Sequence, residues 1–161
     1  MMWPMSELLD APPLGPQQML LACRRLMDGH GLSAWHLRLS CGRRRMGSCA
    51  YHQRTIRLSR HLLQNNAWPV VCDTVLHEIA HALVGEGHQH DAVWRAKARE
   101  LGATPAATCR DRDLKMPEPP WQAWCPACQV VVGRYHRPPR HWRRGYRHRT
   151  CGRKVEFRKK G

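Results

Sequence analysis

Acidic residues, long hydrophobic runs and regularly repeated glycine are scarce or missing in this chain of 161 residues. No apolar stretch approaches the ~20 residues that cross a bilayer, and the first twenty positions lack a basic and then apolar leader, so neither a membrane protein nor an exported one is expected. Glycine and proline number 12 each without a three-residue period, which excludes collagen. A hydrophobic content of 42% is sufficient for a packed core and excludes wholesale disorder. We expect a cytoplasmic monomer, associated with the nucleoid if the host is bacterial.

The few acidic residues leave the C-terminal part of the chain strongly basic. Residues 1–120 carry 15 Lys and Arg against 11 Asp and Glu, whereas residues 121–161 carry 12 against a single glutamate. Trp and Tyr lie between these basic residues, and the combination is typical of nucleic-acid binding. No apolar helix face accompanies them, so a membrane partner is not expected. The pattern predicts DNA as a partner, and a solvated basic end without function is the alternative.

Hydrophobic periodicity predicts an α+β fold for the body of the chain. Apolar residues that recur every three or four positions, with Pro, Ser or Asp at the start of the segment, predict helices over 16–28, 60–63, 69–84 and 91–101. Alternation of apolar and polar residues predicts strands over 35–39, 46–51 and 55–59. We expect these strands to form a small antiparallel sheet.

Composition predicts the domain boundaries. Prolines interrupt residues 1–15, which we expect to be a flexible N-terminal arm. The folded body is expected at 16–102, and a segment rich in proline and charge at 103–120 is expected to be a linker. Residues 121–161 are then a small basic module.

Eight cysteines raise the question of disulfides. An unexported chain lies in a reducing compartment, where cysteines near histidines more often bind metal. Five cysteines are scattered singly and are expected to be small buried apolar residues: Cys23, Cys41, Cys49, Cys72 and Cys109. A disulfide between Cys41 and Cys49 is the alternative.

The predicted helix over 69–84 contains the motif His-Glu-Ile-Ala-His. His77 and His81 are four residues apart, so one face of the helix can present two imidazoles to one Zn²⁺ ion. Glu78 lies beside that face, where it can act as the general base of a hydrolase. Glycines then turn the chain and return His88 and His90, one of which we expect as the third ligand, with His90 favoured. The alternative is that these histidines are surface residues of an amphipathic helix.

The basic module contains a second candidate metal site. Cys125 and Cys128 are spaced as in a zinc knuckle, and His148 and Cys151 repeat that spacing. We expect these four residues to hold a structural Zn²⁺ ion in a Cys₃His zinc ribbon, which the module needs because it has few apolar residues. His136 or His141 is an alternative to His148.

A loop of arginines and aromatic residues lies between the two halves of this predicted zinc site. Its arginines can pair with phosphates and its aromatic rings can stack on bases. No pattern for reading base edges is present, so the sequence specificity is expected to be weak. The candidate nucleic-acid-binding residues are Arg137, Arg140, Trp142, Arg143, Arg144, Tyr146 and Arg147.

An ordered set of motifs resembles the SprT-like family of zinc metalloproteases, which includes the Spartan proteases that digest proteins crosslinked to DNA. The set comprises WHLRLS at 35–40, Gly47 to Tyr51, IRLS at 56–59, VLHEIAHAL at 75–83, and then GHQHDAVW and KARELGA. The resemblance implies a minimal zincin-type domain with the HExxH motif on a central helix. It also implies His90 as the third ligand, because the family has that histidine four residues before an aromatic residue, here Trp94. The family often ends in a zinc ribbon with four cysteines, from which His148 departs.

These observations predict a zinc-dependent endopeptidase with a three-histidine site. The resemblance implies that its substrates are DNA-bound or DNA-crosslinked proteins, as in the repair of DNA–protein crosslinks, and the basic ribbon would bind the DNA. Tyr51 and Arg43 to Arg45 are open candidates for stabilising the oxyanion. The alternatives are a non-catalytic, zinc-containing factor that binds nucleic acid or acts in transcription, and an unrelated metallohydrolase of small amides.

Overall fold

The computed structural model describes residues 15–106 and 114–160. The chain divides into two compact units, Met1–Met116 and Pro117–Gly161. The division falls inside the segment 103–120, where a linker is expected. The predicted arm, apart from Gly15, and Cys109 lie outside the described residues.

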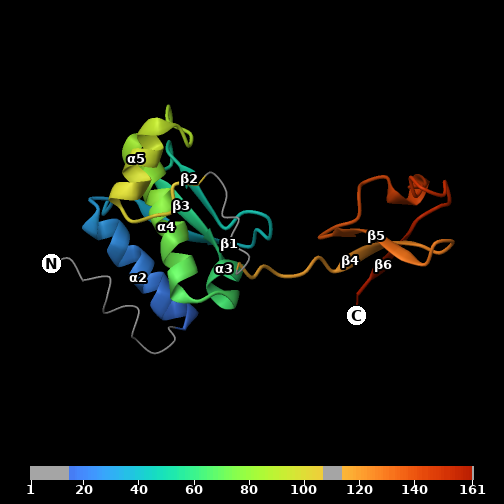
Figure 1. Cartoon of the computed structure of the whole chain (residues 1–161). Coiled ribbons are helices and arrows are strands. Elements are labelled where there is room, and N and C mark those ends of the chain that lie inside the picture. Colours follow the sequence, from blue (N-terminus) through green and yellow to red (C-terminus); the bar gives the residue numbers. More distant parts are fainter. Residues whose placement is uncertain (1–14, 107–113, 161) are drawn as a thin grey trace. The chain divides into compact units, whose positions relative to one another are not determined.

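The first unit combines helices with a small sheet (Figure 1). Its described helices are α2 (Pro16–Gly29), α3 (Arg60–Asn65), α4 (Trp68–Val84) and α5 (Ala92–Glu100). Its described strands are β1 (His36–Ser40), β2 (Gly47–Ala50) and β3 (Thr55–Ser59). The predicted α+β class is therefore confirmed. None of the described helices is both long enough and apolar enough to cross a membrane.

The order and direction of the strands differ from the antiparallel sheet expected from the sequence. The order is β1–β3–β2, with β2 antiparallel to β3 and β1 parallel to it. β3 takes the centre because it is buried along most of its length, including Ile56 and Leu58, whereas β1 and β2 remain partly exposed. The prediction of an antiparallel sheet is confirmed for β2 and β3 and wrong for β1, because alternation of apolar residues predicts a strand but not which strand it pairs with or in which direction.

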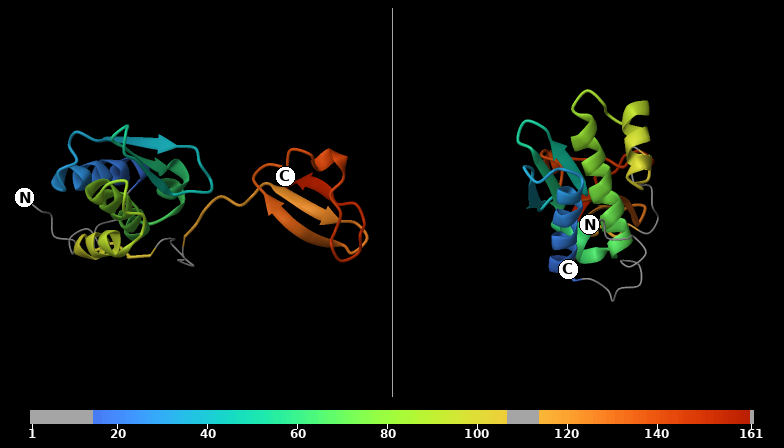
Figure 2. Two further views of the ribbon diagram at one scale, coloured as in Figure 1. Left: turned by 90° about the horizontal axis from the view of Figure 1, so that it is seen from above. Right: turned by 90° about the vertical axis from the view of Figure 1, so that its left-hand side faces the viewer.

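Helix α4 is the centre of the first unit. It contacts α2 and α5 as well as β2 and β3, and the views in Figure 2 show it between α2 and α5. Apolar residues on several sides of α4 are buried, among them Val71, Val75, Leu76 and Ile79. Burial stabilises the fold by roughly 1.5–3 kcal/mol for each such side chain. Because α4 is surrounded, even its polar residues Glu78 and His81 are buried.

Local hydrogen bonds fix where the helices begin and end, as the sequence predicts. The hydroxyl of Ser59 accepts a hydrogen bond from the backbone N–H of His61 at the start of α3. The carboxylate of Asp91 accepts one from the N–H of Trp94 at 3.0 Å and caps α5. Gly85, with φ at +87°, ends α4 in a conformation that glycine adopts without strain.

Parts of the segment 103–116 are packed on the first unit. Ala103 is buried, and the backbone N–H of Thr104 donates to the carboxylate of Asp73 at 2.7 Å. The side-chain oxygen of Asn66 accepts from the N–H of Lys115 at 2.7 Å, and its amide nitrogen donates to the Lys115 carbonyl at 2.9 Å. Both described ends of the segment are therefore bonded to the first unit.

The second unit is a small antiparallel sheet, which Figure 1 shows with its loops. It contains β4 (Trp121–Cys125), β5 (Val130–Tyr135), the short 3₁₀ helix η1 (Trp142–Arg144) and β6 (Glu156–Lys159), and the strand order is β5–β4–β6. Its core consists of Ala123, Val155 and Phe157 with three half-buried aromatic rings. Val130, Val131 and Val132 of β5 are 37–43% exposed, because β5 is an edge strand. A core this small needs further stabilisation, such as a structural metal.

The scattered cysteines only partly meet the expectation of burial. Cys23 and Cys72 are buried, but Cys41 is exposed and Cys49 is half-buried. Cys41 and Cys49 are both free thiols, so the alternative disulfide is not formed. Cys41 is exposed because it begins the loop between β1 and β2, where the alternating pattern has ended.

Candidate metal centres

Three histidines meet beside helix α4, and we refer to His77, His81 and His90 as the histidine triad. His77 and His81 lie one turn apart on α4, and His90 comes from the loop between α4 and α5. The Nε2 atom of His90 is 3.0 Å from the Nε2 atoms of both His77 and His81. The ligand atoms of all three lie within 4.8 Å of one another. The structure therefore brings together the three residues predicted as ligands of a catalytic zinc ion.

The loop conformation decides which histidine completes the triad. His90 has a φ of +57°, in the left-handed region, which turns the backbone sharply. His88 points elsewhere, because its Nδ1 bonds to the carboxylate of Asp91 at 2.7 Å. Asp91 thus caps α5 and holds His88, and the favoured choice of His90 agrees with the geometry.

Trp94 supports all three imidazoles. Its side chain is completely buried, and its ring centroid lies 4.6 Å from that of His77, 5.1 Å from that of His81 and 4.5 Å from that of His90. The contact with His81 is stacked, and the other two are edge contacts. The rings are therefore held in place by packing, which reduces the conformational freedom they would lose on binding a metal.

The electrostatics of the triad favour metal ligation. Burial and the neighbouring imidazoles lower the pKa of His77 and His81 to about 4, and burial lowers the pKa of His90 as well. A neutral imidazole is the form that binds a metal. Two nitrogens bound tetrahedrally to one zinc ion at ~2.1 Å would be roughly 3.4 Å apart, and the two separations to His90 are 3.0 Å. Three nitrogen donors with one side open fit a catalytic zinc site.

Glu78 lies next to the triad, against the first residue of β2. Its side chain is 7% exposed, and burial raises its pKa to about 8. A Cβ atom at Gly47 would lie 2.5 Å from the Glu78 Oε1 atom and 2.7 Å from its Cγ, so only glycine fits there. Sequence reasoning missed this role of Gly47, for which the signal is a glycine at the start of a strand.

The triad and Glu78 line a cleft of about 580 Å³. Its walls also include Arg44, Arg45, Tyr51 and Asp73. The hydroxyl of Tyr51 lies 3.5 Å from His81 Nδ1, on the opposite side of the ring from the nitrogen that faces the triad. Tyr51 therefore orients His81, and its hydroxyl is engaged there; the sequence left Tyr51 open as an oxyanion donor.

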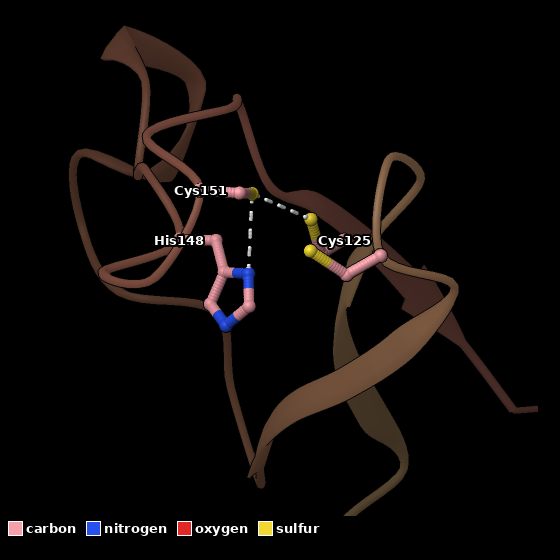
Figure 3. Close-up of side chains that lie close together, drawn as sticks. Cys125, His148 and Cys151 are labelled. Atoms are coloured by element: carbon pink, nitrogen blue, oxygen red, sulfur yellow. Dashed lines mark hydrogen bonds between the residues drawn. The ribbon is translucent and has the colours of Figure 1, made fainter.

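The second unit contains the other candidate metal site, and we refer to Cys125, Cys128, His148 and Cys151 as the Cys₃His cluster. Its four ligand atoms lie within 4.8 Å of one another. Figure 3 shows Cys151 Sγ between Cys125 Sγ, 3.5 Å away, and His148 Nδ1, 3.3 Å away. Among the described residues, neither His136 nor His141 belongs to the cluster. Three thiols and one imidazole fit a closed structural zinc site.

The backbone of the second unit prepares this cluster for metal. A backbone hydrogen bond from Arg153 lowers the pKa of the Cys151 thiol and favours its thiolate, the form that binds zinc, whereas the hydrogen bond with Cys151 raises the pKa of the Cys128 thiol to about 11. Cys125 ends β4, and Gln129, with φ at +55°, closes the turn that brings Cys128 back to it. Cys151 lies just before Gly152, where φ is +67°. Two tight turns thus place the two halves of the cluster face to face.

The candidate nucleic-acid-binding residues lie on and around η1. The arginines at 137, 140, 143, 144 and 147 are all exposed. Trp142 packs against Phe157 at 5.6 Å, and the guanidinium of Arg143 lies over its ring at 5.3 Å. Tyr146 also contacts Phe157 but is 41% exposed, so it has more surface free for stacking than Trp142. Arg147 donates to the Gly152 carbonyl at 2.9 Å and so also supports the loop 147–152, which carries His148 and Cys151 and which we refer to as the zinc loop.

One comparison with known proteins gave a match. The model of the SprT-like family matches residues 18–113, which is more than half of the chain and contains the whole histidine triad. The match ends before the Cys₃His cluster. No curated protein and no solved structure matches the chain.

Proposed function

Because this chain belongs to the SprT-like family, we propose that it is a zinc-dependent endopeptidase that cleaves DNA-bound or DNA-crosslinked proteins. One observation carries the proposal: three converging imidazoles and a buried carboxyl group share one open cleft. Such a donor set is what hydrolysis of a peptide by zinc requires.

The histidine triad would hold the zinc ion, which when bound supplies Lewis acidity toward the peptide carbonyl and the attacking water. Glu78 accepts the proton of that water and passes it to the leaving amine nitrogen. A carboxyl group with a raised pKa is suited to both transfers, because it can take up and release a proton near neutral pH. Trp94 and Tyr51 keep the imidazoles oriented throughout.

The basic second unit supports the choice of substrate. It carries 12 of the 27 Lys and Arg residues and only two of the 12 Asp and Glu residues. Exposed arginines around η1 can pair with phosphates without reading base edges, so the enzyme would be recruited to DNA and not to a particular sequence. Proteins that are bound or crosslinked to DNA are then presented to the protease at high local concentration.

The variant Glu78→Gln tests the proposal on a protein crosslinked to an oligonucleotide. Cleavage should fall by about 10²–10⁴-fold, because the general base is lost. The zinc content and the affinity for DNA should be unchanged, since Glu78 is in neither predicted ligand set. If wild type and variant were equally inactive but bound DNA equally well, the chain would instead be a non-catalytic nucleic-acid-binding factor.

A further inference from the structure

An arginine-lined pocket lies beside the catalytic cleft. The loop 41–46 between β1 and β2 carries Arg43, Arg44 and Arg45 in succession, and Arg57 of β3 faces the same space. Together with the backbone around them these side chains enclose about 580 Å³, which we refer to as the arginine pocket. Within the described ranges, no carboxylate forms an ion pair with any of these four arginines.

The loop that carries the arginines is held in place at both ends by one buried residue. The hydroxyl of Ser59 donates to the carbonyl of Gly42 at 2.6 Å, and the backbone N–H of Ser59 donates to the carbonyl of Met46, also at 2.6 Å. Ser59 is completely buried at the end of β3. The three arginines therefore project from a fixed backbone, so little loop ordering is needed when an anion binds.

The arginine pocket shares a wall with the cleft that contains the triad. Arg44, Arg45 and the start of β2 line both spaces. Gly47 lies between the two spaces: it contacts Glu78 of the catalytic cleft, and in the chain it directly follows the loop 41–46 that carries the arginines. A polypeptide in the cleft therefore passes the arginines within a few residues of the bond beside Glu78.

We propose that Arg43, Arg44, Arg45 and Arg57 form a subsite for an acidic side chain of the substrate polypeptide, so that cleavage is favoured near aspartate or glutamate. This inference rests on the proposed function of the same cleft. Guanidinium groups match carboxylates in shape and charge and bind them with charge-assisted hydrogen bonds. Among the described residues that line the catalytic cleft, Asp73 and Glu78 are the only ones with a carboxyl group, and Asp73 is already bonded to Thr104.

A peptide carboxylate fits the pocket better than a nucleic-acid phosphate. The pocket adjoins the cleft proposed to take the polypeptide, with Arg44 and Arg45 lining both, so a side chain of that polypeptide can reach the arginines without a second ligand. A nucleic-acid backbone needs a long basic track, whereas residues 1–120 are nearly balanced, with 15 basic and 11 acidic residues.

The test uses the full-length, zinc-loaded protein and a mixture of synthetic peptides with randomised sequence, whose cut sites are identified by mass spectrometry. Asp and Glu should be enriched at one position a few residues from the cut. For the best peptide, replacing that acid by its amide should lower kcat/KM about tenfold. In the variant Arg43→Ser, Arg44→Ser, Arg45→Ser the two peptides should be cleaved at similar rates, so that the ratio of their kcat/KM values falls from about ten to near one.

A matched control removes three exposed arginines of the same unit that do not line the pocket: Arg25→Ser, Arg60→Ser, Arg99→Ser. This control should keep the full preference for acids, which separates a local subsite from a general effect of charge. An unchanged preference in the loop variant would overturn the proposal. Loss of affinity for a 20-nucleotide DNA in the loop variant, with the acid preference intact, would also overturn it and would assign the pocket to phosphate.

Binding to the Glu78→Gln protein separates this inference from the proposed function. Fluorescence anisotropy of the labelled acidic peptide and of its amide analogue reports the subsite without any cleavage. Tighter binding of the acidic peptide, lost in the loop variant, would support the subsite even if the wild type cleaved nothing. Equal binding of both peptides, together with active wild-type cleavage, would overturn the subsite and leave the peptidase intact.

Discussion

At the scale of single residues, the position of Glu78, the proposed general base, depends on Gly47 having no side chain. Glu78 lies against the Cα of Gly47, and no other residue type leaves room for its carboxyl group in that place. Because Glu78 belongs to a rigid central helix and Gly47 to a paired strand, neither backbone can easily withdraw. The carboxyl group is thus aimed by the packing of β2 on α4.

Gly47→Ala should therefore impair catalysis more than stability. The new methyl group displaces the Glu78 carboxyl, and a shift of about 1 Å at a catalytic group lowers the rate by roughly 10- to 100-fold. Zinc content, measured by elemental analysis, should stay at the wild-type level because the triad is not touched. Gly29→Ala is the control, since nothing lies within 4 Å of a Cβ there. Equal activities of the two variants would contradict the role assigned to Gly47.

At the scale of elements, helix α5 completes the triad without containing any of its histidines. Trp94 of α5 packs on all three imidazoles, and Asp91, which caps α5, follows His90 directly. His90, which has a left-handed backbone conformation, directly precedes this cap and packs on Trp94. The third ligand is therefore held by a helix start and a tryptophan.

Asp91→Ala should weaken both α5 and the zinc site. The N–H of Trp94 loses its acceptor, so the Tm should fall by a few degrees, and the affinity for zinc in a chelator competition should fall with it. His88→Ala removes only the exposed pair with Asp91 and leaves the cap intact. This control should change both quantities much less. A zinc affinity that did not respond to loss of the cap would show that His90 is fixed in another way.

The zinc loop of the second unit allows a sharp test of ligand identity. His148→Ala should remove one of two zinc ions per chain and make the unit sensitive to proteases, because its core is too small to fold alone. His148→Cys should retain the ion, since a thiolate also suits a structural zinc site. Zinc is measured by elemental analysis of the purified chain. Two ions retained in the alanine variant would contradict the assignment of His148.

At the scale of the whole molecule, charge and chemistry are divided between the two units. The first carries the histidine triad and the cleft, and the second carries most of the excess positive charge. The matched residues of the family end at 113, so the basic unit lies outside the family match. We expect the first unit to determine what is cut and the second to determine where the protein acts.

DNA binding should accordingly depend on salt and on the arginines around η1. Replacing Arg137, Arg140, Arg143 and Arg144 by Gln should lower the affinity for DNA at least tenfold and reduce the slope of log K against log salt by about one for each lost phosphate contact. Arg147 is left in place because it supports the zinc loop. The variant Arg25→Gln, Arg38→Gln, Arg99→Gln removes charge from the first unit and should bind DNA almost as well as the wild type. The opposite ranking of the two variants would place the DNA site on the first unit.

Local sequence determined a large part of this protein. Residue spacing predicted the helices and strands that the structure describes in the first unit, since these periods and caps depend only on nearby residues. It also predicted one part of each candidate metal site: the pair His77 and His81 on α4 follows from one helical turn, and the pair Cys125 and Cys128 from one tight turn. Such short-range geometry needs no knowledge of the rest of the fold.

Tertiary structure decided what depends on residues far apart in the chain. Only packing placed β3 between β1 and β2, with β1 parallel to it, and only packing brought Gly47 against Glu78. The choice between His88 and His90 as the third member of the triad depended on the packing of Trp94 against His90. The arginine pocket depended on the hydrogen bond by which Ser59 holds its loop. A sequence pattern records the period of an element, whereas its neighbours and the space left between them are set by how all elements fill one core.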